Sequence, residues 1–330
     1  MTYEKSAPLD QRTLRAAIEL ASHAPSVHNS QPWRWVTGPR TVHLYADLRR
    51  WLPATDADGR DLVVSCGAVL HHLRVALAAA GVGTTVHRLP DPARPELLAR
   101  VDLHPGGGRG CGVDPAQAAA ITLRRTDRRR FDGWAVPDAV ITQFERHAGA
   151  QGAVLRVVTD EMALHTLYAA IRAAAAEHDE DAVVEAELIA WTGLHGGDAG
   201  VPAANIPVPG RLSGGPPERR FAGAELTERG AVTPDSATLL VIGTSSDDRL
   251  SQLRAGEAAS AVLLQATLAG MSTSPLTEAL EISRTRAVVA DEVLDGTLSP
   301  QMVIRVGWPS SAAPAPPQTP RRALDDQLER

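Results

Sequence analysis

The apolar residues of this chain recur with helical spacing in some segments and form short strand-like runs in others. Helical spacing is found at residues 14–21, 115–123, 138–148, 67–81 and 256–270. Strand-like runs occupy residues 33–36, 99–103 and 303–307. The runs at 67–81 and 256–270 carry few charges along most of their length, so we expect both helices to be buried nearly all round. The pattern predicts a mixed α and β fold with these two helices at its centre.

The two long helical runs also resemble each other. Residues 67–81 read GAVLHHLRVALAAAG and residues 256–270 read GEAASAVLLQATLAG, framed by glycines at the same spacing. Small residues and then a strand-like run follow each of them, and the helical runs at 14–24 and 138–148 match more loosely. We therefore predict an internal duplication that folds as a pseudo-dimer within one chain, with an antiparallel-rich sheet in each half. This α+β arrangement divides the chain into a first repeat, 1–112, and a second repeat, 113–330.

The two predicted repeats differ in length. The long helices are 189 residues apart (256 minus 67), whereas the opening helices are 124 apart (147 minus 23), so the second repeat carries about 65 extra residues. Most of the excess must fall between residues 158 and 237, which include a Gly- and Pro-dense stretch at 193–223. A long loop in a compact protein is usually a lid or a binding loop, and a plain disordered insertion is the alternative.

Composition and simple sequence patterns argue against several kinds of function and site. The formal net charge of −6 disfavours a general nucleic-acid role. The two cysteines form no CxxC pair, so we expect neither a metal site nor a disulfide. No signal-peptide pattern or membrane-spanning run is evident, which makes a cytoplasmic protein without a membrane partner the expectation. The run DADGRD at 56–61 hints at a calcium loop, but a turn or a helix N-cap fits it better.

The turn at residues 25–33, PSVHNSQPW, is the most informative segment of the chain. It lies between a helical run and a strand-like run and combines two prolines with Ser, His, Asn and Gln side chains. Such a turn suits a flat ligand with polar edges, although it could simply cap the preceding helix. The segment resembles the flavin-contacting PSxxNxQPW turn of the nitroreductase family. The resemblance implies that Pro25, Ser26, His28, Asn29 and Gln31 contact the flavin ring.

A second motif suits a phosphate group. Residues 124–131 read RRTDRRRF and resemble the RRSxRxF phosphate-binding opening of a nitroreductase subunit, with one extra residue before the Phe. Arginine binds phosphate through paired, charge-assisted hydrogen bonds. The resemblance assigns the phosphate to Arg124, Arg125, Thr126 and Arg128, and a C-terminal basic pair, Arg321 and Arg322, matches the family segment that reaches back to it. A solvated basic face or an RNA-contacting patch is the alternative for the arginine run.

The repeats divide these motifs between them. The 25–33 turn belongs to the first repeat, and the arginine run and tail pair belong to the second. In a nitroreductase homodimer, each flavin site combines the phosphate cluster of one subunit with the turn of the other. The opposite combination here would pair QRTLR at 11–15 with GAQGA at 149–153, which lack the required residues. We therefore predict a single FMN per chain, with Pro275 and Leu276 along its ring in place of the family's Pro-Ile-Glu-Gly loop.

Together, the duplication and the motifs place the resemblance with the Acg-type nitroreductase-like proteins of actinobacteria. It implies a tandem-duplicated nitroreductase-like fold and an oxidoreductase that passes hydride from NAD(P)H through FMN to a small electron-poor acceptor. The protein itself would need no catalytic acid or base, because the cofactor carries the chemistry. Thr277 and Glu278 stand where the family has an acidic residue and a glycine, so storage of FMN under a lid is the alternative function. The assembly would be a monomeric pseudo-dimer or a homodimer of pseudo-dimers.

Overall fold

The computed structural model describes residues 10–107, 112–208, 219, 221, 223–227, 235–310 and 314–329. Its helices are α1 (Gln11–Ala21), α2 (Arg60–Ala79), α3 (Ala118–Ile121), α4 (Asp138–Ala150), α5 (Glu161–Asp179), α6 (Ala182–Trp191), α7 (Arg249–Leu268), α8 (Glu278–Glu281) and α9 (Ser283–Val288). Its strands are β1 (Trp33–Thr37), β2 (Thr41–Ala46), β3 (Val82–Arg88), β4 (Leu97–Pro105), β5 (Phe131–Asp132), β6 (Val154–Val158), β7 (Thr192–Leu194), β8 (Val201–Pro202), β9 (Thr238–Thr244), β10 (Ser272–Leu276) and β11 (Ser299–Pro309).

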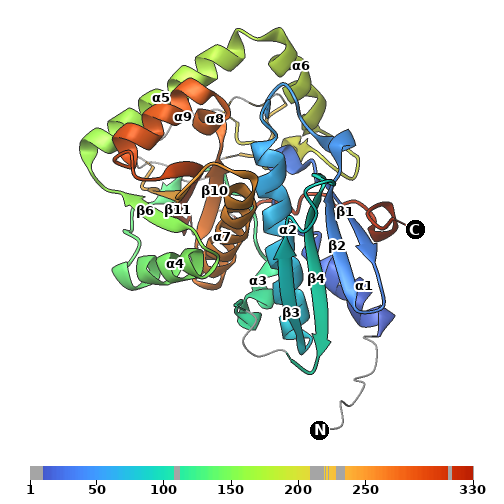
Figure 1. The fold of residues 1–330 in the computed structure, drawn as a ribbon. Helices are drawn as coiled ribbons and strands as arrows, with labels where there is room; N and C mark the ends of the chain where they lie inside the picture. Colours follow the sequence, from blue (N-terminus) through green and yellow to red (C-terminus); the bar gives the residue numbers. More distant parts are fainter. Residues whose placement is uncertain are drawn as a thin grey trace.

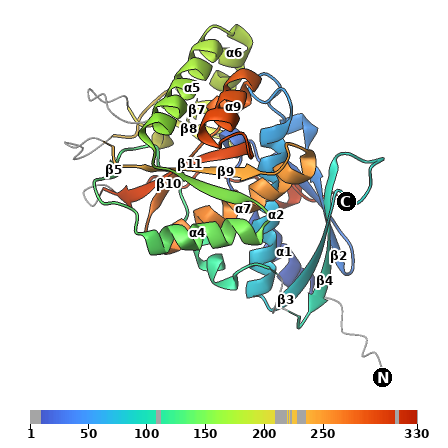
Figure 2. The same ribbon diagram turned by 60° about the vertical axis from the view of Figure 1, so that its left-hand side comes forward.

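Two antiparallel sheets flank a central pair of helices. The first sheet has the order β1-β2-β4-β3, and the second has the order β10-β11-β9-β6 with β5 paired to β11. Helices α2 and α7 lie side by side between the sheets in both views (Figures 1 and 2). The predicted α+β class and the antiparallel sheet in each half are confirmed. How the chain divides into domains stays a prediction.

The two central helices touch at a pair of glycines. A Cβ atom on Gly67 would come within 2.1 Å of the Leu253 carbonyl oxygen, and one on Gly256 would come within 2.0 Å of the Val64 oxygen. These two contacts are reciprocal, because 64 and 67 become 253 and 256 on addition of the 189-residue offset. Such reciprocity is what a pseudo-twofold axis produces. The duplication itself stays a prediction, now with this geometry in its favour.

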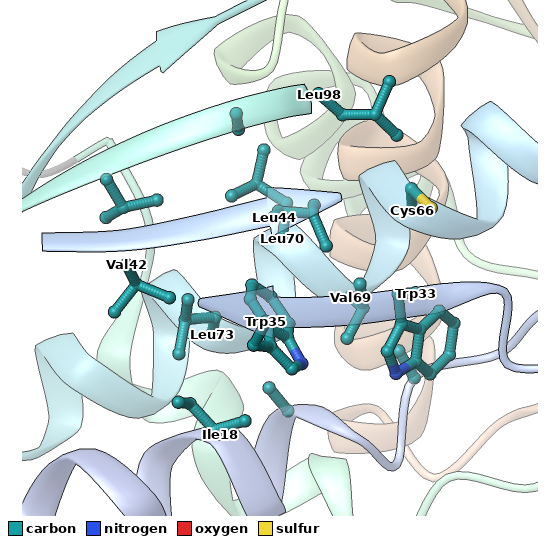
Figure 3. Packing of buried hydrophobic residues seen from close by; sticks show 14 of the residues in the cluster. Ile18, Trp33, Trp35, Val42, Leu44, Cys66, Val69, Leu70, Leu73 and Leu98 are labelled. Atoms are coloured by element: carbon teal, nitrogen blue, oxygen red, sulfur yellow. The ribbon is translucent and has the colours of Figure 1, made fainter. Parts of the chain in front are cut away.

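The core is divided among the sheet faces. The first sheet buries one face against α1 and α2, where Trp33 and Trp35 lie among Val69 and Leu73 (Figure 3), and β2 alternates buried and half-buried residues accordingly. The second sheet is covered on both faces, by α4 and α7 on one side and by α5, α8 and residues 289–294 on the other. Its central strand β11 is therefore apolar and buried along most of its length.

Helix α2 differs from its sequence-based prediction. It begins at Arg60 rather than Gly67, and Asp56 caps it by accepting hydrogen bonds from the backbone of Asp61 and Leu62 at 3.0 and 2.9 Å. The N-cap position itself is Gly59, so the 56–61 run forms a turn before the helix, and Asp56 supplies its capping hydrogen bonds from within that turn. With 20 residues, α2 is long and apolar enough to cross a membrane, contrary to the sequence expectation, but 94% of its apolar window is buried inside the protein. It is the core helix of this fold.

The extra residues of the second half form structure of their own. Helices α5 and α6 fill residues 161–191, where the sequence analysis assigned no element. The predicted lid, 193–223, holds the short parallel pair β7 and β8 and not only loop, and much of its remainder lies outside the described residues. Residues 108–111, which precede the predicted boundary between the repeats and include Cys111, also lie outside them. At the other end of the chain, residues 314–329 return to the first half, where Leu328 pairs with Trp35 of β1.

Candidate flavin and phosphate site

The turn after α1 is held in an unusual backbone conformation. His28, Asn29 and Gln31 have positive φ angles of 44°, 53° and 51°. Conformations of this kind cost side chains such as His and Gln on the order of 1 kcal/mol or more each and cluster at functional sites. The Ser26 hydroxyl accepts a hydrogen bond from Gln31 N at 2.9 Å, and Val27 N donates to Ser65 of α2 at 3.1 Å. These bonds fix the turn against the start of the central helix.

A cavity opens where this turn meets both central helices. Counted with its open mouth, it encloses about 990 Å³. Its wall is largely apolar and comes from both halves of the chain, which fits a flat ring system with few polar contacts. Side chains from the turn, α2, α7, β10 and the segment after β10 line it, including Ser26, His28, Asp61, Ser65, Ala68, Ala259, Leu263, Pro275, Leu276 and Glu278.

A smaller, strongly cationic pocket adjoins this cavity. It is lined by Arg124 and Arg125 from the segment after α3 and by Arg321 from the C-terminal arm, residues 314–329, with Asn205 beside them. Thr126 lines both spaces, so the pocket and the cavity are neighbours. Among the described residues, no carboxylate lines the pocket. We call this space the arginine pocket.

The guanidinium groups of the arginine pocket are crowded. Burial, followed by the nearby charges of Arg125 and Arg128, lowers the pKa of Arg124 to about 10. Burial, followed by Arg124 and Arg125, lowers the pKa of Arg321 to about 9. The Nε atoms of Arg124, Arg125 and Arg321 are buried without hydrogen-bond partners. Like charges that are desolvated together are costly unless an anion joins them, so the pocket is suited to a phosphate group.

Ten of the thirteen sequence-predicted site residues line one of these two spaces. Those in the cavity are Pro25, Ser26, His28, Thr126, Arg128, Pro275 and Leu276. Those in the arginine pocket are Arg124, Arg125, Thr126 and Arg321. The structure thus brings the 25–33 turn and the arginine run together, as the sequence analysis expected. Burial of Arg124 and the pairing of Arg129 with Asp127 at 2.8 Å differ from a solvated basic face.

The other three predicted residues, Asn29, Gln31 and Arg322, form hydrogen bonds to other segments of the chain. Asn29 donates to the carbonyl oxygens of Gly200 and Pro320 at 3.0 and 3.1 Å. Gln31 donates to the Asp198 oxygen at 2.8 Å and accepts from Arg322 N at 2.9 Å. The Arg322 guanidinium donates to the backbone oxygens of Gln31, Trp33 and Asp326. These side chains secure the C-terminal arm against the turn and line neither space.

Two residues of the predicted lid segment lie across the cavity. Arg219 forms ion pairs with Glu278, at 3.2 Å, and with Glu281, and it donates to His28 Nε2 at 3.0 Å. Phe221 meets the His28 ring edge-on at 6.0 Å, and the Arg128 guanidinium lies 4.9 Å from the Phe221 ring centre. Burial, aided by Arg219 and Arg128, lowers the pKa of His28 well below its usual value. The imidazole is therefore neutral and accepts the Arg219 hydrogen bond.

Several lining residues escaped the sequence analysis. Asp61, Ser65 and Ala68 belong to α2, and Ala259 and Leu263 belong to α7. The available signal was the glycine pair at 67 and 256, because small residues such as Ala68 and Ala259 near a close helix crossing leave room for a ligand. Glu278 was noted as a departure from the family's loop, but its pairing with Arg219 was not foreseen.

Comparison with known proteins places the chain in a family. No family model matches it. A Mycobacterium tuberculosis protein named "Putative NAD(P)H nitroreductase" is 45% identical over 323 residues, covering 97% of this chain and 92% of the relative. "Putative NAD(P)H nitroreductase acg" from the same organism is 38% identical over 319 residues, covering 95% of this chain and 94% of the relative.

Solved structures with a related arrangement are more distant. A nitroreductase with bound FMN from Bacteroides fragilis is 13% identical, with a TM-score of 0.40, covering 63% of this chain and 95% of that one. The FMN-dependent nitroreductase NfnB from Mycobacterium smegmatis, in complex with NADPH, is 18% identical, with a TM-score of 0.41, covering 66% and 99%. The sequence relatives decide the assignment: this chain belongs to the nitroreductase family, in the group that includes Acg.

Proposed function

We propose that this chain is an FMN-binding oxidoreductase that takes hydride from NAD(P)H and passes it to a small electron-poor acceptor. The observation that carries the proposal is the arginine pocket, free of carboxylates among the described residues and joined through Thr126 to a largely apolar cavity. A flavin mononucleotide has a phosphate at one end and a flat ring system at the other. The two adjoining spaces match these two ends in chemistry and in order.

The residues of both spaces suit this ligand. Three buried Nε–H groups and the unpartnered Asn205 Oδ1 leave hydrogen-bonding capacity for a phosphate and its neighbouring hydroxyl groups. In the cavity, the short side chains of Ala68 and Ala259 leave space for the ring beside α2 and α7, and Pro275 offers a flat apolar face. We assign the phosphate to Arg124, Arg125, Arg321 and Thr126, and the ring to the cavity walls. Arg322 then has the structural role of anchoring the arm.

We infer one FMN per chain, because the opposite side of the helix pair is filled with charge. The 189-residue offset relates the cavity residues Ser65 and Ala68 to Arg254 and Glu257, and Leu263 to Arg74. The fully buried Glu257 pairs with Arg74 and with Arg88, each at 2.6 Å. A buried ion network therefore occupies the place that would mirror the cavity. Gln151, from the segment that replaces the ligand-binding turn, accepts a hydrogen bond from Arg74 at 2.7 Å.

In this proposal, FMN supplies the hydride-transfer chemistry, and the chain supplies placement and electrostatics. The arginine pocket fixes the phosphate end, and the apolar wall excludes water from the ring. His28 is neutral, so at neutral pH it contributes a polar contact rather than a proton. As expected from the sequence, the proposal assigns no catalytic acid or base to the hydride transfer.

Storage of FMN is the second candidate, and a specific observation favours it. Arg219 links Glu278 to His28, and Phe221 contacts His28 and Arg128, so these two residues of the predicted lid join separate parts of the cavity lining. Closure of this kind would shield a bound ring from a nicotinamide and from any acceptor. Glu278, where the family has glycine, strengthens the closure through its ion pair.

An anaerobic NADPH titration of the FMN-loaded protein separates the two functions. Bleaching of the flavin absorption bands supports the oxidoreductase. Bands that persist in the wild type but bleach in Arg219→Ala support storage behind a closed lid. Arg94→Ala, which removes an exposed ion pair with Asp91, serves as the matched control. A protein that takes up no FMN would overturn both functions.

A further inference from the structure

Asp61 is a buried carboxyl group in the cavity wall that the proposed function leaves without a role. It lies in the first turn of α2, is 3% exposed, and lines the cavity next to Ser65. Its Oδ2 atom is buried and has no hydrogen-bond partner. The backbone on either side is tightly held, with Asp61 N donating to Asp56 and the Ser65 hydroxyl donating to Asp61 O at 2.5 Å. The side chain is therefore fixed in the wall without a protein group to neutralise it.

The cations nearest to Asp61 are committed elsewhere. The Arg60 guanidinium donates to Pro300 O at 2.9 Å and to Gln301 Oε1 at 2.8 Å, and it pairs with Asp247 at 3.3 Å. Arg219 pairs with Glu278 and Glu281 on α8. Neither arginine forms an ion pair with Asp61 in the described part of the chain. A buried carboxylate left in this position would be costly, and such groups take up a proton instead.

Burial and the nearby negative charges both favour the protonated form of Asp61. Burial, followed by the negative charges of Asp56 and Glu281, raises the pKa of Asp61 to about 8, while Arg60 and Arg219 oppose the rise. Of the other titratable groups that line the cavity, Glu278 is neutralised by Arg219. His28 is neutral, and Arg128 lies against Phe221. Among the described carboxyl groups that line the cavity, Asp61 is the one whose pKa is raised.

We propose that Asp61 holds a proton and donates a hydrogen bond to a carbonyl oxygen of the ligand bound in the cavity. An acid O–H at this position has no acceptor among the described side chains, so its acceptor must come from whatever fills the cavity. The choice of ligand rests on the proposed function, because the pyrimidine part of a flavin ring carries two carbonyl oxygens. Ligand affinity then depends on a proton that the protein, and not the ligand, supplies.

The protonation of Asp61 can be tested without flavin. Infrared difference spectra of the apoprotein at pH 7, wild type minus Asp61→Asn, should contain the carbonyl stretch of one protonated carboxylic acid. The band should disappear from the wild type as the pH rises above 8. The matched control is Asp58→Asn, which removes an exposed carboxylate three residues earlier. The difference spectrum of wild type minus Asp58→Asn should contain no such band. Absence of the band at pH 7 would overturn the proposal.

The hydrogen bond to the ligand is tested by FMN binding between pH 7 and 9. The Kd of the wild type should rise above pH 8, approaching tenfold per pH unit, as one required proton is lost. The Kd of Asp61→Asn should rise less steeply, because an amide keeps a donor at every pH and only the arginines of the arginine pocket can then lose charge. Arg124 and Arg321 are present in both proteins, so the difference between the two profiles reports Asp61. A wild-type Kd that is flat, or that falls with pH, would overturn the proposal.

The two experiments also distinguish failure of the inference from failure of the proposed function. A wild type that binds no FMN at any pH would contradict the proposed function and the ligand assignment together. The infrared band would still decide whether Asp61 holds a proton. A wild type that binds FMN with a profile identical to Asp61→Asn would contradict only the inference.

Discussion

Arg321 Nη1 donates a hydrogen bond to Asn29 Oδ1 at 3.0 Å, although 292 residues separate them. This bond joins the C-terminal arm to the turn after α1, and it aims an arginine of the arginine pocket from a segment that has no regular secondary structure. Asn29 also holds the arm through Pro320 O. In the proposed site, the turn would therefore affect the phosphate end through the arm, as well as the ring end.

Removal of the Asn29 side chain should weaken flavin binding at the phosphate end. Asn29→Gly keeps the positive φ angle of 53° without strain but releases Arg321, so we expect the FMN Kd to rise about tenfold. Asn29→Asp should weaken binding further, because it places an anion next to the phosphate. Fluorescence titration of the apoproteins with FMN measures both. Wild-type affinity in Asn29→Asp would contradict the assignment of Arg321.

Removal of one arginine from the arginine pocket should raise the stability of the apoprotein and weaken FMN binding. Arg124→Met removes a buried cation that is repelled by its neighbours, so the apoprotein should melt at a higher temperature than the wild type. The same variant should bind FMN about 10- to 100-fold more weakly, through loss of charge-assisted hydrogen bonds to the phosphate. Differential scanning calorimetry and FMN titration report the two effects. A variant with both lower stability and unchanged affinity would show that Arg124 is structural.

The crossing of α2 and α7 should tolerate no added side chain. Gly67→Ala places a Cβ atom 2.1 Å from Leu253 O, so we expect a loss on the order of 3 kcal/mol in the free energy of unfolding. Gly149→Ala in α4 is the matched control, because no atom lies within 4 Å of its added Cβ. That variant should be neutral or more stable by about 0.5 kcal/mol. Equal effects of the two substitutions in urea unfolding would contradict the close crossing.

The ion network at the mirror position should serve stability and not cofactor binding. Glu257→Ala leaves Arg74 and Arg88 without the carboxylate that they share, and we expect a loss of about 3 kcal/mol or more in unfolding free energy. FMN affinity, measured well below the melting temperature, should stay within about twofold of the wild type. A large loss of affinity with little change in stability would place a flavin at the mirror position instead.

Part of this architecture could be read from the sequence because it depends on local pattern. The glycine-framed runs identified the two central helices, and the capping preference of aspartate identified the turn before α2. Helix α2 nevertheless begins seven residues earlier than its apolar run. Its first turn contains Arg60, whose burial depends on distant partners such as Gln301 and Asp247, and Asp61, which lines the cavity.

The sequence predicted most residues of the candidate site, but not which of them line it and which bind distant parts of the chain. A polar turn residue can bond a ligand or the backbone of a distant segment equally well, so Asn29 and Gln31 could not be assigned from spacing alone. Their partners at residues 198–200 and 320–322 come together only in the fold. Asp61 was missed for a different reason, since an acidic residue in the first turn of a helix is ordinarily solvent-exposed.

The central claim, one FMN per chain held by its phosphate in the arginine pocket, is tested most directly by a stoichiometric titration. Apoprotein at a concentration far above Kd is titrated with FMN while the quenching of flavin fluorescence is followed. We predict a sharp end point at one FMN per 34.9 kDa chain, which Arg124→Met and Arg321→Met weaken and Arg94→Ala leaves unchanged. An end point at two FMN per chain, or no binding, would contradict the account.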